Sequence, residues 1–262
     1  DFNGDGFGDL IVSAKGESTS NSGGEGIVHA MLSFPDLSNN LIITRLSSQW
    51  DSGFNSNFGD SLATGDFNGD GFDDLIVGVP SEDIESAENA GMIQVFYGGV
   101  SPFSVTNIFH QNSAGVAGSA LSNERFGAAV ASGDLNADGY DDVVIGVPGE
   151  YRCWPHIRVC GPVGAIQLLY GSENGIRSDN DQYFGQRSNG VTAHPSVGDR
   201  FGASVSTGDI NGDGYDDVVV GSPQEYYWPN ARYCARYSCG QVGAINVLYG
   251  SADGVTTTDD HY

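Results

Sequence analysis

Residues 209–223 have the sequence DINGDGYDDVVVGSP, an acidic, glycine-containing stretch that runs directly into valines. Asp209, Asp213 and Asp217 place three carboxylates within nine residues. Carboxylates this close repel one another, so we expect a cation between them. The run Val218–Val220 is typical of a buried strand. The stretch therefore predicts a cation-binding turn that leads into the core of an all-β fold.

Closely similar stretches occur four times in the chain. DFNGDGFGDLIV begins at Asp1, DFNGDGFDDLIVGVP at Asp66, DLNADGYDDVVIGVP at Asp134, and the fourth copy at Asp209, so the starts are 65, 68 and 75 residues apart. A Phe-Gly pair precedes the last three copies, and segments such as GMIQVFYGG, GAIQLLYGS and GAINVLYGS follow them. Each repeat thus contains several short β-like runs separated by turns, without a helical period.

Four short strands per repeat, repeated radially, are typical of the blades of a β-propeller. A solenoid is less favoured, because its period is usually about 20 to 45 residues. We predict a single all-β region over residues 1–262 that is a β-propeller or part of one. The expected repeats are about 1–57, lacking its first strand, 58–125, 126–200, and 201–262, with an incomplete last strand.

Each acidic loop has the oxygen-rich pattern that calcium prefers. Side chains at loop positions 1, 3, 5 and 9 supply oxygens, position 7 supplies a backbone carbonyl, and glycine at position 6 permits a sharp turn. Soft metals would require sulfur or imidazole ligands. An EF-hand would need an acidic residue at position 12, where this chain has valine or isoleucine. The predicted ligands of up to four Ca²⁺ ions are Asp1, Asn3, Asp5, Phe7, Asp9, Asp66, Asn68, Asp70, Phe72, Asp74, Asp134, Asn136, Asp138, Tyr140, Asp142, Asp209, Asn211, Asp213, Tyr215 and Asp217.

The combination of Phe-Gly, DxNxDGxxD, a VGVP-like segment and a GxIxxxY strand resembles the FG-GAP repeats of integrin α-subunit propellers. The resemblance spans essentially the whole chain. It implies four-stranded blades, with calcium between the first and second strands, in a ring of seven blades. This chain has four calcium loops and no Phe-Gly strand before the first. It is therefore expected to be part of a larger ring, or to be completed at its ends by another chain.

Long inserts follow the second predicted strand in the third and fourth repeats. They contain all four cysteines, as the close pairs Cys153/Cys160 and Cys234/Cys239. Neither spacing matches a zinc-binding pattern, so we predict two short-range disulfides. Disulfides persist in oxidising compartments, which indicates an extracellular or cell-surface location.

The same inserts are rich in aromatic and arginine side chains, which concentrate at binding hot spots. In the resembled family these loops lie on the face opposite the calcium sites, where partners bind. The alternative is that the aromatic rings cover the blade ends and the arginines pair with the acidic surface. The predicted ligand-contacting residues are Tyr151, Trp154, His156, Arg158, Tyr226, Tyr227, Trp228, Arg232, Arg236 and Tyr237.

Composition limits the partners. The 262 residues include 34 acidic and 10 basic side chains, giving a net charge of −24, which argues against nucleic acid or anionic membrane as partners. No apolar stretch is long enough to cross a bilayer. Because the chain begins inside a motif, we expect a mature or partial product.

No recognisable catalytic motif accompanies the histidines or serines, so we predict a protein that is not an enzyme. The sequence favours an extracellular module for adhesion or ligand recognition, with structural calcium and a protein or glycan ligand on the face of the cysteine-containing loops. One alternative is a structural subunit of a surface filament or sheath, which self-associates through incomplete end blades. Another is a lectin-like glycan binder.

Overall fold

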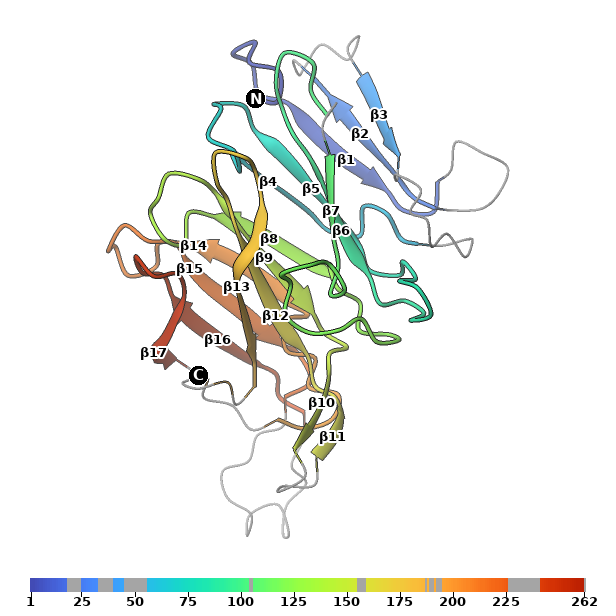
Figure 1. The fold of residues 1–262 in the computed structure, drawn as a ribbon, viewed down its shortest axis with the longest axis vertical. Helices are drawn as coiled ribbons and strands as arrows, with labels where there is room; N and C mark the ends of the chain where they lie inside the picture. The colour runs from blue at the N-terminus through green and yellow to red at the C-terminus, as the bar shows by residue number, and fades with distance from the viewer. Residues whose placement is uncertain are drawn as a thin grey trace.

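The computed structural model describes residues 1–17, 25–32, 40–44, 56–103, 106–154, 159–186, 188, 191, 195–225 and 241–261. Within these ranges the protein is all-β, without helices, and its strands form antiparallel sheets that follow one another along the chain (Figure 1). No helix in this part of the chain is long and apolar enough to cross a membrane.

Four sheets, which we call blades 1 to 4, make up the body of the structure. Blade 1 has the order β1 (Leu10–Ala14), β2 (Ile27–Met31), β3 (Asn40–Thr44). Blade 2 has the order β4 (Leu62–Gly65), β5 (Asp74–Val79), β6 (Met92–Phe96), β7 (Thr106–Phe109). Blade 3 has the order β8 (Ala129–Gly133), β9 (Asp142–Val147), β12 (Ala165–Tyr170), β13 (Arg177–Gly185). Blade 4 has the order β14 (Ser204–Gly208), β15 (Asp217–Ser222), β16 (Ala244–Tyr249), β17 (Thr256–His261).

The second strand of each four-stranded blade lies inside its sheet. Every residue of β5 and β9 is buried, because each strand has a neighbour on both edges and packed side chains on both faces. Such strands have near-continuous apolar sequences, which explains the LIV and VVI runs. The predicted all-β fold of four-stranded blades is confirmed.

The core lies between successive blades, in three clusters of buried apolar side chains. The phenylalanines of the three Phe-Gly pairs, Phe58, Phe126 and Phe201, are fully buried, one in each cluster. Burying a phenylalanine contributes about 1.5–3 kcal/mol relative to leaving it exposed. The Phe-Gly signature is therefore the part of the repeat that packs one blade on the next.

Backbone hydrogen bonds also join the blades at each Phe-Gly pair. The amide of Phe126 donates to the carbonyl of Ala90 at 2.8 Å, and Gly91 forms a parallel bridge with Phe126. A Cβ at Gly91 would lie 2.3 Å from the Phe126 carbonyl oxygen, so only glycine permits this approach. Gly164 and Phe201 form the same bridge between blades 3 and 4.

A tyrosine after the third strand makes another connection between blades. Tyr97, which follows β6, is buried, and its hydroxyl accepts a hydrogen bond from the amide of Ile176 in blade 3 at 2.9 Å. Gly175 precedes Ile176 at φ +87°, and a Cβ there would lie 2.1 Å from the Tyr97 hydroxyl oxygen. Tyr170 and Gly254 have the same relation between blades 3 and 4, at 2.2 Å.

Candidate functional site

The acidic loops all lie at one end of the blades, because each one leads into the start of the equivalent strand. We number the nine residues of each loop as positions 1 to 9. Loops 1 to 4 are residues 1–9, 66–74, 134–142 and 209–217. Loops 2 to 4 join the first strand of a blade to its second, and in loop 2 the closing pair is Gly65 with Asp74. This is the position predicted from the sequence.

Loop 2 shows how the backbone wraps around the carboxylate at position 1. Asp66 accepts hydrogen bonds from the amides of Asp70 at 3.1 Å and Gly71 at 2.9 Å. Asn68 Oδ1 accepts from the Asp70 amide at 2.9 Å, and Asp70 Oδ1 accepts from the Phe72 amide at 3.0 Å. Equivalent bonds occur in loops 1, 3 and 4. They bring the oxygen-bearing side chains of positions 1, 3 and 5 into one tight turn.

Glycine is required at position 6 because of the backbone conformation and not because neighbouring atoms crowd the site. Its φ lies between +83° and +91° in all four loops, and a Cβ there would meet nothing within 4 Å. This left-handed conformation is the sharp turn that the sequence predicts at position 6. A larger residue would fit the space but would strain the loop.

The carboxylate at position 9 connects the loop to the third strand of its own blade. Asp74 is fully buried and accepts hydrogen bonds from the amide of Phe67 at 3.0 Å and the amide of Gly98 at 2.7 Å. Asp142 and Asp217 make the equivalent pairs of bonds. A carboxylate has about four acceptor positions, so lone pairs remain for an ion.

Two of the carboxylates at position 9, those of Asp74 and Asp142, lie in an environment that disfavours their negative charge. Burial raises the pKa of Asp74 to about 7, opposed by the amides of Gly98 and Phe67, and the charges of Asp70 and Asp66 raise it further. The pKa of Asp142 rises to about 8, again mainly through burial. A divalent cation would favour the charged forms and reverse these shifts.

The donor chemistry of each loop fits calcium. Among the residues described, no three carboxylate, imidazole or thiolate groups lie close enough together to hold a metal by themselves. Each loop instead combines two carboxylates, at positions 1 and 5, with an amide oxygen at position 3. Hard oxygen ligands of mixed type, with backbone carbonyl and water completing the shell, suit calcium and not zinc. The twenty predicted ligands stay a prediction.

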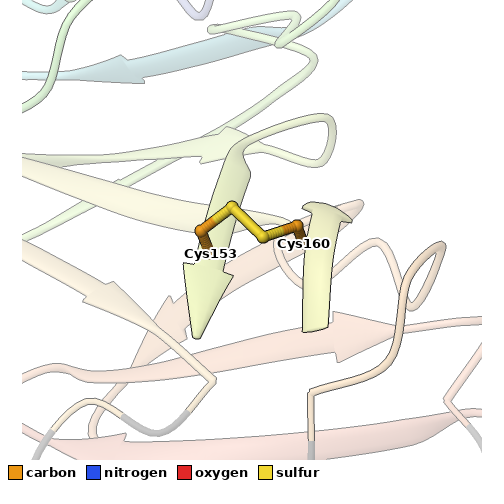
Figure 2. The surroundings of a disulfide bond; sticks show 2 residues. All are labelled: Cys153 and Cys160. Atoms are coloured by element: carbon orange, nitrogen blue, oxygen red, sulfur yellow. A yellow bond between two sulfur atoms is a disulfide. The ribbon is translucent and has the colours of Figure 1, made fainter. Parts of the chain in front are cut away.

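A disulfide-closed hairpin lies at the opposite end of blade 3 from its acidic loop. It consists of β10 (Tyr151–Trp154) and β11 (Val159–Pro162), which pair Cys153 with Cys160. The two cysteines form a disulfide, as their spacing predicts (Figure 2). The hairpin follows the end of β9, whereas the loop precedes its start. The predicted Cys234–Cys239 pair lies outside the described residues.

Two side chains of the hairpin bear on ligand contact. Tyr151 is 47% exposed, as expected for a residue that could contact a ligand. Arg152 lies 4.4 Å above the ring centroid of Tyr183, and its Nε donates to the tyrosine hydroxyl at 2.9 Å. Arg152 was not among the predicted ligand-contacting residues, and its contact with Tyr183 on β13 joins residues 31 positions apart in the sequence. For Trp154 no side chain is described. The other candidates lie outside the described residues: His156, Arg158, Tyr226, Tyr227, Trp228, Arg232, Arg236 and Tyr237.

A buried acidic cluster beneath the hairpin was not predicted from the sequence. Gln111 Nε2 donates to Glu150 Oε2 at 2.7 Å, and Glu124 accepts from the amides of Leu121 at 2.8 Å and Tyr151 at 3.1 Å. Burial, and then the nearby charge of Glu150, raise the pKa of Glu124 to about 7. One sequence signal could have indicated the cluster: a glutamate recurs two residues after a proline, as in Pro148-Gly149-Glu150. The cluster fixes the base of the hairpin.

Repeated antiparallel blades, each with an acidic loop between its first two strands, define an all-β repeat protein of the propeller type. The family model for the FG-GAP repeat matches residues 1–31, 58–96, 126–169 and 201–236, which is more than half of the chain. The chain belongs to the FG-GAP repeat family.

Relatives include two integrin α subunits. The chain is 31% identical over 172 residues to integrin alpha-PS3 of Drosophila melanogaster, covering 65% of this chain, and 30% identical over 206 residues to integrin alpha pat-2 of Caenorhabditis elegans, covering 75%. It is also 34% identical over 131 residues, half of this chain, to the phosphatidylinositol-glycan-specific phospholipase D of Bos taurus. In each case the chain spans 14% of the relative's length.

Among solved structures, the rhamnogalacturonan lyase PL11 of Bacillus licheniformis aligns with a TM-score of 0.46 at 16% identity. The alignment covers 83% of this chain and 38% of the lyase.

Proposed function

We propose that this chain is an extracellular, calcium-binding recognition module of the adhesion type, in which calcium is structural and the ligand binds at the end of the blades that carries the β10–β11 hairpin. The main observation is the separation of two kinds of loop. Acidic loops of one repeated geometry lie at one end of the blades, and a disulfide-closed hairpin lies at the other. The relatives named as integrin α subunits support the adhesion role.

The structural role of calcium follows from where the loops lie. Loops 2 to 4 each close a hairpin whose second strand lies inside the blade, and the carboxylate at position 9, as in Asp74, binds the backbone just after the third strand. An ion that neutralises the loop would therefore hold three strands of a blade in place. Because structural hydrogen bonds enclose these carboxylates, they are poor candidates for acid–base catalysis. We therefore propose a binding function and not an enzymatic one.

A calcium titration tests the proposal directly. Isothermal titration of the metal-free chain with calcium should show up to four bound ions. Asp70→Ala removes the position 5 ligand of loop 2 and should remove one ion. Asp253→Ala changes the same charge at an exposed turn and should leave the stoichiometry unchanged. An absence of binding at millimolar calcium would refute the calcium sites.

The recognition surface needs a separate test. The probes are a glycan array and a panel of immobilised extracellular-matrix proteins, used with calcium present. Replacing Cys153 and Cys160 by serine removes the constraint on the hairpin, which lowers its ordering before binding, so affinity for any captured ligand should fall. Arg177→Ala, on the outer strand β13 and away from the hairpin, is the control. Undiminished binding by the double serine variant would exclude the hairpin as the recognition element.

A further inference from the structure

Acidic loops 1 to 3 are each bound by the blade that follows them. The amide of Asp141, at position 8 of loop 3, donates to the carbonyl of Asp66 at 3.0 Å, and the amide of Asp66 donates back to Asp141 Oδ2 at 2.9 Å. Ser172, just after the third strand of blade 3, donates to the carbonyl of Phe67 at 3.2 Å. The first two residues of loop 2 are therefore held by blade 3. We call this arrangement the inter-blade joint.

The joint recurs between the other blades. The amide of Asp216 donates to the carbonyl of Asp134 at 3.0 Å, the Asp216 carboxylate accepts from the Asp134 amide, and Ser251 donates to the carbonyl of Leu135 at 3.2 Å. Between loops 1 and 2, Asp73 donates to the carbonyl of Asp1 at 3.2 Å. Position 1 is a predicted calcium ligand in every case, so each joint holds a residue of the preceding site.

Glycines make room for the joint. A Cβ at Gly133, the residue before loop 3, would lie 2.3 Å from Asp216 Oδ2, and one at Gly65 would lie 2.4 Å from Asp141 Oδ2. The aromatic ring at position 7 also reaches the preceding loop. A Cβ at Gly69 would lie 2.6 Å from Tyr140 Cε1. Backbone, carboxylate and ring thus contact the preceding loop together.

The joint connects one calcium site to the next through three consecutive residues. In loop 4 these are Tyr215, Asp216 and Asp217, where positions 7 and 9 are predicted ligands of their own loop and position 8 binds loop 3. One short segment thus serves both loops: the carbonyl of position 7 and the carboxylate of position 9 belong to the predicted site of its own loop, and the amide and carboxylate of position 8 bind the preceding loop. An ion in loop 4 that fixes positions 7 and 9 would also fix Asp216 against Asp134.

We propose that Asp73, Asp141 and Asp216 are positioning residues that couple each calcium loop to the loop of the preceding blade, so that adjacent sites bind calcium cooperatively. The proposal rests on the proposed calcium sites. Coupling between two binding sites is reciprocal, so an ion in either loop strengthens binding in the other. Filling the sites would then stiffen the contact between blades as well as the loops themselves.

Terbium luminescence measures one loop at a time in the intact 262-residue chain. Terbium occupies calcium-type oxygen sites, and a tyrosine beside the ion sensitises its emission. Positions 7 of loops 3 and 4 are Tyr140 and Tyr215, whereas loops 1 and 2 have phenylalanine. Because the Tyr140 ring also lies against loop 2, the background combines Tyr215→Phe with Asp70→Ala, which empties loop 2, so that the emission reports loop 3. An additional Tyr140→Phe change should abolish the emission as a check of the assignment.

The coupling is measured by emptying loop 4 with Asp213→Ala. With Asp216 present, this change should raise the terbium dissociation constant of loop 3 about fivefold or more, which is in the usual range of coupling between sites. In an Asp216→Ala background, the same change should alter that dissociation constant by less than about twofold. Asp216→Asn keeps an oxygen that accepts the Asp134 amide and should preserve the coupling. Circular dichroism and the urea midpoint establish that each variant is folded.

Two results would overturn the coupling. The first is that Asp213→Ala leaves the terbium dissociation constant of loop 3 unchanged while Asp216 is present. The second is that Asp213→Ala raises this constant equally with and without Asp216. Both results are compatible with four independent calcium ions, so they would leave the proposed function intact. If the unmodified chain binds neither calcium nor terbium, the proposed calcium sites fail, and the coupling fails with them.

Discussion

Replacing Gly175 by alanine tests whether Tyr97, just after the third strand of blade 2, holds blade 2 against blade 3. Gly175 has φ +87°, and alanine in the left-handed region costs about 1–2 kcal/mol. The added methyl would also lie 2.1 Å from the Tyr97 hydroxyl oxygen, so the ring must move and release the amide of Ile176. A buried amide left without its acceptor costs about 1–3 kcal/mol. Together these give about 2–5 kcal/mol.

Gly16→Ala is the matched control, because Gly16 has φ +78° but a Cβ there would meet nothing within 4 Å. It should cost the conformational part alone, about 1–2 kcal/mol. Urea denaturation gives both free energies of unfolding, and an unchanged slope indicates that the midpoint reports stability. If the two variants lose the same stability within about 0.5 kcal/mol, Tyr97 does not stabilise the contact between blades.

Three further predictions concern the ion, the buried acids and the core. Excess chelator should lower the melting temperature, because calcium at 100 times its dissociation constant contributes about 2.7 kcal/mol per site, and an unchanged melting curve would contradict structural calcium. The pKa of Glu124 rises from its usual 4.5 to about 7 in the folded protein, so its contribution to stability is full below pH 4.5 and is lost as the pH rises through 7. Glu124→Gln should therefore flatten the pH dependence of unfolding in that interval, and a curve parallel to the unmodified protein would be inconsistent with the shift. Phe126→Ala, at a fully buried position, should cost about 3–5 kcal/mol in the same urea assay, and a loss below 1 kcal/mol would exclude its role between blades.

The strands and acidic loops were predictable because their signals are local. The run after Asp74 is apolar on both faces, and β5 is buried throughout, as such a run requires. Gly71 marks a turn that only glycine adopts easily, and its φ is +85°. The Cys153–Cys160 disulfide was equally predictable, because the two cysteines are only seven positions apart in the sequence. Each of these features depends on neighbours within one repeat.

The contacts between repeats could not be predicted in the same way. Asp66 and Asp141 are 75 residues apart, and nothing in the DxNxDGxxD pattern indicates that position 8 binds another loop. The contact depends on how one blade is rotated against the next, which is set by the packing of many side chains. For the same reason the sequence did not connect Gln111 with Glu150, or Arg152 with Tyr183.

The inter-blade joint also bears on how such a chain can change in length. The second and third repeats each contribute to two joints. Loop positions 1 to 4 face the following blade, and positions 7 and 8 face the preceding one. A whole repeat that is duplicated or deleted in phase therefore supplies or removes matching halves, and the blades on either side meet as they did before. Interchangeable modules of this kind allow the number of blades to vary without redesign of any single contact.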